Sequence, residues 1–290
     1  MREFHFIKEK YGFELLMDLH KFEDNDNVFF EPKPHITNFF EIFVFEEGTG
    51  KIELNGHRLQ VGNRNLFFTS PYQKKSCHIN PKEIKGFHLV FQNDFLADFF
   101  EDKLFVYRLQ YFYNALHPQY LQLSQREYLL IETLLNEIIT EIQHFQKDSL
   151  HLIRPLLYFA LSKLNRLYSA VYKLSPETHS DSDIYRFKEA LEIHIREFHS
   201  VDNYCNLLNI NRHQLNKITK AHFGHTSKKV IQFRLLKEVE MELRYSDHTV
   251  AEIAHKLHFS DPNNLTRFFT RLSGESPKAY RLNYQNDRNS

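Results

Sequence analysis

The sequence has no tryptophan, only two cysteines and only eight glycines among its 290 residues. Cys77 and Cys205 lie far apart, in regions predicted to belong to different domains. This argues against a scaffold of disulfide bonds and fits a reducing cytoplasm. No run approaches the roughly 18 apolar residues of a membrane span, and residues Arg2 to Lys10 are too polar for the apolar core of a signal peptide. We therefore expect a cytoplasmic protein without a membrane segment.

Short motifs that mark common enzyme sites are also missing. We find no Gly-rich phosphate loop, no nucleophile elbow and no cysteine pair with metal-binding spacing. The sequence therefore predicts a protein that is not an enzyme and needs no cofactor.

The net charge of zero conceals an asymmetry. The chain has 37 basic and 37 acidic residues, but residues 184–290 hold 17 Lys and Arg against 12 Asp and Glu, and residues 1–183 hold 20 against 25. At this length two domains are expected, and the polar, proline-containing stretch 173–183 is typical of a linker. We predict an N-terminal domain over 1–172 and a basic C-terminal domain over 184–290.

Short apolar runs alternate with turn signals between Phe39 and Phe91. Asn55-Gly56 separates two of these runs and predicts a tight β-hairpin, because both turn residues need a positive φ. Many short strands within a hundred residues favour an antiparallel barrel or jelly roll. The predicted strands cover residues 41–45, 51–54, 57–61, 66–69, 76–79 and 87–91.

Two long amphipathic helices are predicted after the strands. Apolar residues recur at steps of three and four from Tyr128 to Phe145, and a second series runs from Leu152 to Val171. Pro155 falls inside the second series, so that helix should be kinked there or begin near it. The apolar seams predict either a dimer interface or packing within one chain.

Residues 249–281 predict a short helix, a tight corner and a second short helix. The first helix has Ile253, Ala254 and Leu257 on one face, Asp261 or Ser260 can cap the second, and Pro262 suits its first turn. The second helix presents polar side chains opposite its buried face, as a helix that reads a DNA major groove does. An amphipathic hairpin with a solvated polar face is the alternative.

A similar unit is predicted at residues 201–224, with Asn211 as the helix cap and a long connecting helix over 228–245. A rigid spacer of this kind can present two recognition helices to groove segments about one turn apart, roughly 34 Å. The candidate DNA-binding residues are Arg212, His213, Asn216, Lys217, Asn263, Asn264, Thr266 and Arg267.

The C-terminal region resembles the double helix-turn-helix domain of the AraC/XylS family of transcription regulators. The likeness rests on Ile253-Ala254, Phe259-Ser260-Asp261, Leu265 to Phe269, Gly274, Ser276-Pro277 and Tyr280-Arg281. Three positions depart from the family pattern. His258 stands where the family usually has Gly at the corner, Thr270 where it often has Lys, and Cys205 where it usually has Ala.

The N-terminal region resembles the cupin-like effector domain of the same family, through Pro34-His35, Phe40 to Ile42, Gly48 to Gly50 and Phe67 to Pro71. Enzymatic cupins are similar in a His-x-His…Glu pattern with a later His. Here His35 and Glu41 fit that pattern, but Thr37 and Lys75 occupy the other two positions, so we expect no metal site. Small barrels can instead hold one ligand. The aromatic candidates to line it are Phe39, Phe43, Phe67, Tyr72 and Phe87.

Together these features predict an α+β chain: an N-terminal cupin-like antiparallel barrel followed by helices, and an all-α C-terminal domain. Its expected function is sequence-specific transcription regulation under the control of a small-molecule effector. The expected partners are promoter DNA, the effector, a second copy of the chain and RNA polymerase, with no membrane. The alternatives are a cupin-type metalloenzyme fused to a DNA-binding domain, and a regulator that needs no effector.

Overall fold

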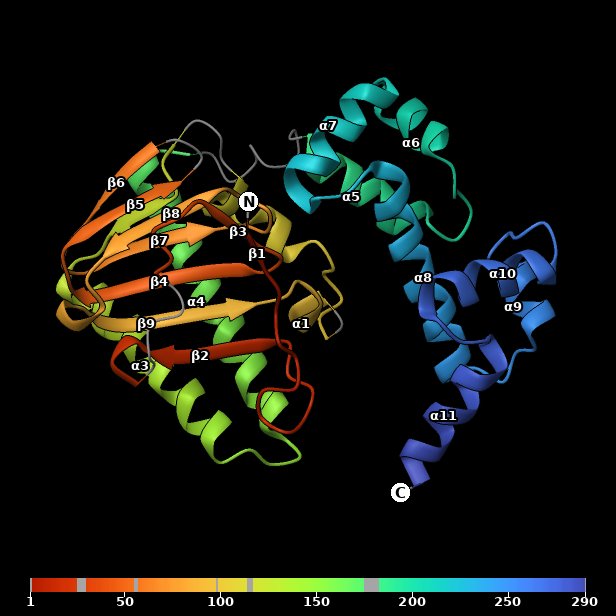
Figure 1. Cartoon of the computed structure of the whole chain (residues 1–290), viewed down its shortest axis with the longest axis horizontal. Helices are drawn as coiled ribbons and strands as arrows, with labels where there is room; N and C mark the ends of the chain where they lie inside the picture. The colour runs from red at the N-terminus through yellow and green to blue at the C-terminus, as the bar shows by residue number, and fades with distance from the viewer. Residues whose placement is uncertain are drawn as a thin grey trace. The chain divides into compact units, whose positions relative to one another are not determined.

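A computed structural model describes residues 2–24, 30–54, 57–97, 99–113, 117–174 and 183–289. The chain divides into two compact units, residues 1–185 and 186–290 (Figure 1). The first unit contains the strands, and the second is helical. Each unit is described by itself.

Two five-stranded sheets form the first unit. One has the order β1-β3-β8-β5-β6 and the other the order β10-β7-β4-β9-β2. Neighbouring strands are antiparallel, except that β1 and β3 are parallel. The bounds are β1 Arg2–Phe4, β2 Met17–Lys21, β3 His35–Thr37, β4 Phe40–Glu47, β5 Gly50–Leu54, β6 His57–Val61, β7 Asn65–Thr69, β8 Lys75–Ile79, β9 Lys85–Phe91 and β10 Tyr120–Gln122.

The expectation of many short antiparallel strands followed by helices is confirmed, although the described strands form two separate sheets and no closed barrel. Strands β5 and β6 pair from Gly50↔Val61 to Leu54↔His57. The turn predicted at Asn55-Gly56 lies outside the described residues.

Side chains alternate between the two faces of the second sheet, as the strand geometry requires. On β9, Phe87, Leu89 and Phe91 belong to the apolar cluster that the sheet shares with the helices. The intervening His88 contacts the inward-facing Phe43 by ring stacking, with centroids 4.5 Å apart. Phe43 belongs to a second apolar cluster, which also contains residues of the other sheet such as Ile52. The unit is therefore layered as sheet, sheet and helices.

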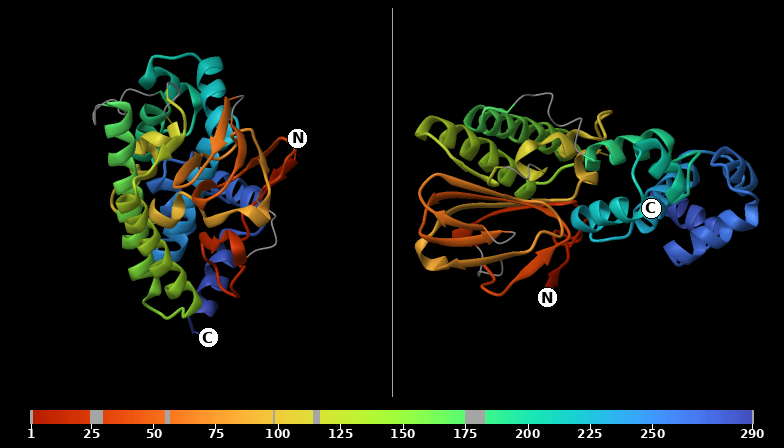
Figure 2. Two further views of the ribbon diagram at one scale, coloured as in Figure 1. Left: turned by 90° about the vertical axis from the view of Figure 1, so that its left-hand side faces the viewer. Right: turned by 90° about the horizontal axis from the view of Figure 1, so that it is seen from above.

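Two long helices form the helical layer of this unit: α3 (Gln125–Gln143) and α4 (Ser149–Tyr172). They lie on one side of the sheets (Figure 2). Ser124 and Glu127 form a capping box at the start of α3, and α4 continues through Pro155. The shorter helical segments are η1 Phe22–Asp24, η2 Pro81–Glu83, α1 Asp94–Ala97, η3 Phe105–Arg108 and α2 Gln110–Tyr113.

Helix α4 has two apolar faces, whereas its sequence predicted one seam. Ile153, Leu157, Leu161, Leu164 and Tyr168 are buried against the sheet and α3. Three residues of the predicted seam are exposed instead, namely Leu152 at 50%, Phe159 at 44% and Val171 at 57%. At the start of the helix, the buried residue is thus Ile153, one position after the predicted Leu152.

The second unit is all helical, as expected. Its helices are α5 Asp183–His194, α6 Val201–Leu208, α7 Arg212–Phe223, α8 Ser227–Tyr245, α9 Val250–Lys256, α10 Pro262–Ser273 and α11 Pro277–Asn289. Val239 and Leu243 of α8 form an apolar cluster with Ile253, Leu265 and Phe269 of the helices that follow. None of the described helices is long and apolar enough to cross a membrane. The predicted linker at 173–183 lies mostly outside the described residues.

Candidate nucleic-acid interface and ligand cavity

Helices α6 and α7 form one helix-turn-helix unit. Helices α9 and α10 form a second unit with the same arrangement. Asn211 caps α7 by accepting a hydrogen bond from the amide of Gln214, and Asp261 caps α10 by accepting one from the amide of Asn264, at 2.9 Å in both cases. Such caps satisfy amide groups that a helix start leaves unpaired. Asn211 was predicted as a cap, and Asp261 was one of the two residues predicted for the other.

Corresponding positions of α7 and α10 are fifty residues apart. Leu215 and Leu265 are fully buried, and Gly224 and Gly274 end the two helices in the left-handed conformation. Lys217 and Arg267 are the corresponding exposed cations. The chain therefore presents the same cationic position twice, once on each second helix.

The corner of each unit also uses a left-handed residue. Asn209 has φ 54° in the first corner, and His258 has φ 52° in the second. The left-handed region costs free energy for residues with a Cβ, although Asn and His tolerate it better than most. His258 thus adopts the conformation that the family's glycine provides, and the second corner carries some backbone strain.

The first recognition helix, α7, exposes Arg212, His213 and Lys217. Arg212 forms an exposed ion pair with Asp202 of α6. Asn216 is only partly exposed, because its side-chain oxygen accepts hydrogen bonds from the amide (2.9 Å) and hydroxyl (2.8 Å) of Ser227. Asn216 therefore holds α7 against the start of α8.

The second recognition helix, α10, exposes Asn263 and Arg267. The side-chain amide of Asn264 donates to Asp261 at 2.6 Å, and its oxygen accepts a hydrogen bond from Arg267. Thr266 donates its hydroxyl to the carbonyl of Pro262 at 3.0 Å. Asn263 and Arg267 are thus the most accessible of the four predicted contacts on this helix.

Buried carboxylates on α8 tie helix α9 and the segment after α5 to this helix. Glu238 accepts from Arg196 at 2.8 Å and pairs with Arg234 at 2.7 Å. Glu242 lies one turn further along, 3.4 Å from Arg196 and 2.8 Å from Lys256 of α9. Arg196 follows α5 and Lys256 ends α9, so this ion-pair network joins three parts of the unit.

The network keeps Glu242 ionised. Burial acts to raise the pKa of this carboxyl, but hydrogen bonds from Lys256 and His248, together with the charges of Lys256 and Arg196, lower it below its ordinary value of 4.5. No sequence motif marks this network, because its members are spread over the chain from Arg196 to Lys256 with no common spacing.

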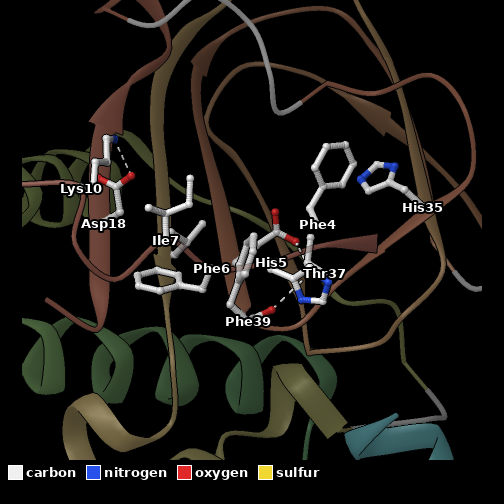
Figure 3. A pocket seen from close by; sticks show the side chains of 11 residues that line it. Phe4, His5, Phe6, Ile7, Lys10, Asp18, His35, Thr37 and Phe39 are labelled. Carbon is white, nitrogen blue, oxygen red and sulfur yellow. Dashed lines mark hydrogen bonds and ion pairs between the residues drawn. The ribbon is translucent and has the colours of Figure 1, made fainter. Parts of the chain in front are cut away.

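A cavity of about 270 Å³ lies in the first unit (Figure 3). Its wall combines the N-terminal segment with side chains of β2, β3, β4 and β9. The lining residues are Phe4, His5, Phe6, Ile7, Lys10, Asp18, His35, Thr37, Phe39, Glu41 and Val90.

Phe39 is the member of the predicted aromatic set that lines this cavity. Phe43 and Phe67 lie between the sheets in a packed cluster with other apolar side chains. Phe87 points to the opposite face of its sheet, in the cluster with the helices. Tyr72 lies after β7 with φ 63°. The cavity residues near the N-terminus were missed because that segment has no motif or periodicity.

Buried polar side chains meet at the Glu41 end of the cavity. Glu41 accepts hydrogen bonds from the hydroxyls of Thr37 (3.0 Å) and Thr69 (2.8 Å), and it forms a buried ion pair with Lys75. The ring nitrogen Nε2 of His88 lies 3.2 Å from Oε1 of Glu41. Burial lowers the pKa of His88 to about 3, so its ring is neutral and donates to the carboxylate.

This cluster contains Thr37, Glu41 and Lys75, three of the four residues compared above with the metal ligands of cupins. The amino group of Lys75 donates to Thr37 at 3.0 Å and pairs with Glu41. Lys75 thus occupies the position of the later histidine, and burial lowers the pKa of its amino group to about 7. Over the ranges that the structure describes, no group of three or more His, Cys, Asp or Glu residues is arranged to hold a metal ion.

A second polar cluster lies at the Asp18 end. Asp18 is 2.6 Å from Nζ of Lys10 and accepts a hydrogen bond from Tyr11. Burial acts to raise the pKa of Asp18, but these hydrogen bonds lower it below its ordinary value. The carboxylate is therefore ionised and balanced by Lys10.

Comparisons with known proteins match both units. The family described as AraC-like ligand binding domain matches residues 20–154, and a helix-turn-helix domain family matches residues 204–283. The transcriptional activator RhaS of Salmonella paratyphi B is 29% identical over 129 residues, which are 44% of this chain and 45% of RhaS. The chain thus spans about half the length of the curated relatives it matches.

Solved structures of regulators are also similar. The DNA-binding domain of AdpA, in complex with a target DNA, is 26% identical and covers 36% of this chain and 94% of that domain, with a TM-score of 0.33. ToxT from Vibrio cholerae with an unsaturated fatty acid bound is 12% identical and covers 92% of this chain and 94% of that one, with a TM-score of 0.40.

Replacing His258 by Gly should stabilise the protein by about 0.5–1 kcal/mol, because Gly adopts a positive φ without strain. His258→Val should destabilise it by about 1–2 kcal/mol, since a β-branched residue is poorly suited to this conformation. Asn209→Gly is the matched control at the other corner and should change stability less, because Asn tolerates the region well. Urea unfolding measures all three, and a destabilised His258→Gly variant would contradict the strained corner.

Glu242→Gln should destabilise the protein near neutral pH, and the difference from the wild type should shrink as the pH falls. The pKa of Glu242 is lowered in the folded protein, so its contribution is present above the unfolded value near 4.3 and is lost as the pH drops through the folded value. Urea midpoints at pH 7, 5 and 3.5 test this, with exposed Glu189→Gln as control. A difference that is the same at every pH would rule out the ionised network as its source.

Proposed function

We propose that this chain, as a member of the AraC family of transcription regulators, binds promoter DNA sequence-specifically under the control of a small molecule held in the N-terminal unit. The observation that carries the proposal is the repeated helix-turn-helix with Lys217 and Arg267 exposed at equivalent positions. The proposed contacts to DNA are Arg212, His213, Lys217, Asn263, Asn264, Thr266 and Arg267. Asn216, the eighth candidate, is bonded to Ser227 instead.

DNA recognition by the C-terminal unit is expected to combine charge with side-chain hydrogen bonds in the major groove. Lys217 and Arg267 supply cations for phosphates or guanine edges, and His213 and Asn263 supply hydrogen-bonding groups at the helix starts. Helix α8 has 19 residues, which at 1.5 Å per residue is about 28 Å. A helix of this length supports the idea that the two units read neighbouring groove segments.

The excess of positive charge supports the same function. Residues 184–290 carry 17 basic against 12 acidic residues, a modest surplus. Binding should therefore weaken as salt rises, but less steeply than for a strongly basic protein. A regulator of promoter DNA works in the cytoplasm, where it also meets RNA polymerase, a further partner that we propose.

Control by an effector is favoured over the alternative without one, because the N-terminal unit has a cavity of ligand size. The matched families are those of a regulator and not of an enzyme. Thr37 and Lys75 replace two histidines of the metal-binding pattern and bond to Glu41 and to each other, which gives the metalloenzyme alternative no support.

A second copy of the chain is the partner that we propose for helix α4. Its outer face carries Leu152, Phe159 and Val171, all exposed, and Leu156 and Leu167 at the margin of the core. These residues follow steps of three, four or multiples of four, as in a coiled-coil seam. An apolar stripe of this length is costly in water and suits a helix–helix interface.

Arg267→Ala should weaken binding to the cognate DNA site by about 1–3 kcal/mol if the guanidinium contacts a base, with relaxed specificity at one position. Lys217→Ala tests the equivalent position of α7. Arg126→Ala, an exposed change on α3 in the other unit, is the control. Fluorescence anisotropy with a site selected from random DNA gives the affinities. Unchanged affinity in Arg267→Ala would remove this residue from the interface.

The double variant Leu152→Glu/Phe159→Glu should shift a dimer towards monomer, because it places charges on both sides of the proposed seam. Analytical ultracentrifugation over a range of concentrations measures the shift. Ile193→Glu replaces an exposed residue (67%) of the other unit and should leave the assembly unchanged. A wild-type chain that is monomeric at all concentrations, or a double variant that dimerises equally well, would exclude this interface.

A further inference from the structure

The polar groups of the cavity wall are charge-balanced. At one end Asp18 lies 2.6 Å from Lys10, and at the other Glu41 forms a buried ion pair with Lys75. Whichever of Glu41 and Lys75 holds the proton, that pair has no net charge. Burial also lowers the pKa of His35, which leaves its ring neutral at pH 7. A charged ligand would therefore lose hydration inside the cavity without gaining a free counter-charge, which is unfavourable.

Between the two polar ends the wall is apolar and rich in rings. Phe6 and Phe39 meet edge to face, with centroids 5.8 Å apart, and Ile7 and Val90 complete this part of the lining. Figure 3 shows Phe6 and Ile7 between the Lys10–Asp18 pair on one side and Thr37 on the other. This arrangement suits a ligand with an apolar body and a polar group at one end.

The wall contains both donors and acceptors, but its donors Lys10 and Thr37 are already hydrogen-bonded to Asp18 and Glu41. The ionised carboxylate of Asp18 only accepts hydrogen bonds, and Oε1 of Glu41 has acceptor capacity beyond its contact with His88. Nδ1 of His35 lies 3.0 Å from the carbonyl of Lys33, so Nδ1 carries the proton in the neutral ring and Nε2 is an acceptor. A matching ligand must therefore supply the donor.

The volume limits the size of the ligand. A water molecule occupies about 30 Å³ in the liquid, so a cavity of about 270 Å³ has room for about nine such volumes. This corresponds to a molecule of about ten non-hydrogen atoms.

We propose that the cavity binds a small, uncharged, largely apolar alcohol or phenol, with the hydroxyl group donating to Glu41, Asp18 or His35. The inference names the ligand class of the effector site and so rests on the proposed function. An uncharged hydroxyl fits the charge balance, the acceptors at the two ends and the ring-lined centre at once, whereas a carboxylate or an ammonium ion fits only the apolar centre.

Two matched series of probes test the class on the full-length protein. One is 2-phenylethanol, phenylacetate and 2-phenylethylammonium, and the other is 1-octanol, octanoate and octylammonium. Isothermal titration calorimetry should give the alcohol of at least one series a Kd at least about tenfold lower than those of its charged analogues. A charged member that binds as well as its alcohol, or the failure of both alcohols to bind at millimolar concentration, would overturn the proposal.

Two variants locate the binding. Phe6→Ala should weaken alcohol binding at least about fivefold, whereas Phe233→Ala, which removes a ring 39% exposed on α8, should not change it. Equal binding by Phe6→Ala would show that the probes bind elsewhere. Thermal unfolding of each variant verifies that it is folded.

Removal of the balancing cation tests the charge argument. Lys10→Met leaves Asp18 without this partner, so the ammonium probe should gain at least about threefold in affinity relative to its alcohol. No gain would contradict the role of charge balance.

DNA binding is measured on the same samples. Absence of sequence-specific DNA binding in the wild type would end the regulatory proposal while leaving the ligand result intact. Failure of the alcohols to bind would end the ligand proposal while leaving the DNA result intact.

Discussion

Docking of both helix-turn-helix units on a single helix, α8, is the constraint on which the rest of the C-terminal unit depends. Val239 and Leu243 bury the apolar side of that helix against α9 and α10, and Glu238 and Glu242 add buried ion pairs to Arg196 and Lys256. Burial of unpaired carboxylates would be strongly destabilising. Their cations come from α8 itself (Arg234) and from segments that pack on it (Arg196 and Lys256). The ion pairs thus accompany the apolar contacts at this junction.

The N-terminal unit has two interior regions, one apolar and one partly polar. The face of the second sheet that meets the helices is filled with rings and aliphatic side chains and leaves little room. Between the sheets, a packed aromatic cluster around Phe43 and Phe67 is followed by the polar groups of Glu41, Thr37 and Lys75. The cavity adjoins this polar region, where satisfied hydrogen bonds make a ligand-accessible wall possible without exposing the apolar core.

Local features of the C-terminal unit could be predicted from the sequence. Caps such as Asn211 and Asp261 act within one turn of the chain, and helical periodicity shows which face is buried. The strands of the N-terminal unit could also be predicted from local features, namely short apolar runs that alternate with turn residues. Features that depend on tertiary contacts could not be predicted. Asn216 was expected to face outward, but it accepts a hydrogen bond from Ser227 at the start of α8, and the position of α8 is not evident from the sequence around Asn216. The cavity could not be predicted, since its wall joins residues as distant as Phe4 and Val90.

Selection of bound duplexes from a random DNA pool, followed by sequencing, tests the central claim that two linked units read one DNA face. The account predicts a bipartite motif whose halves have centres about one helical turn apart, roughly 10 base pairs, with fixed spacing because α8 joins the units rigidly. A pool without enrichment, or enrichment of one short half-site with no preferred second half, would contradict it.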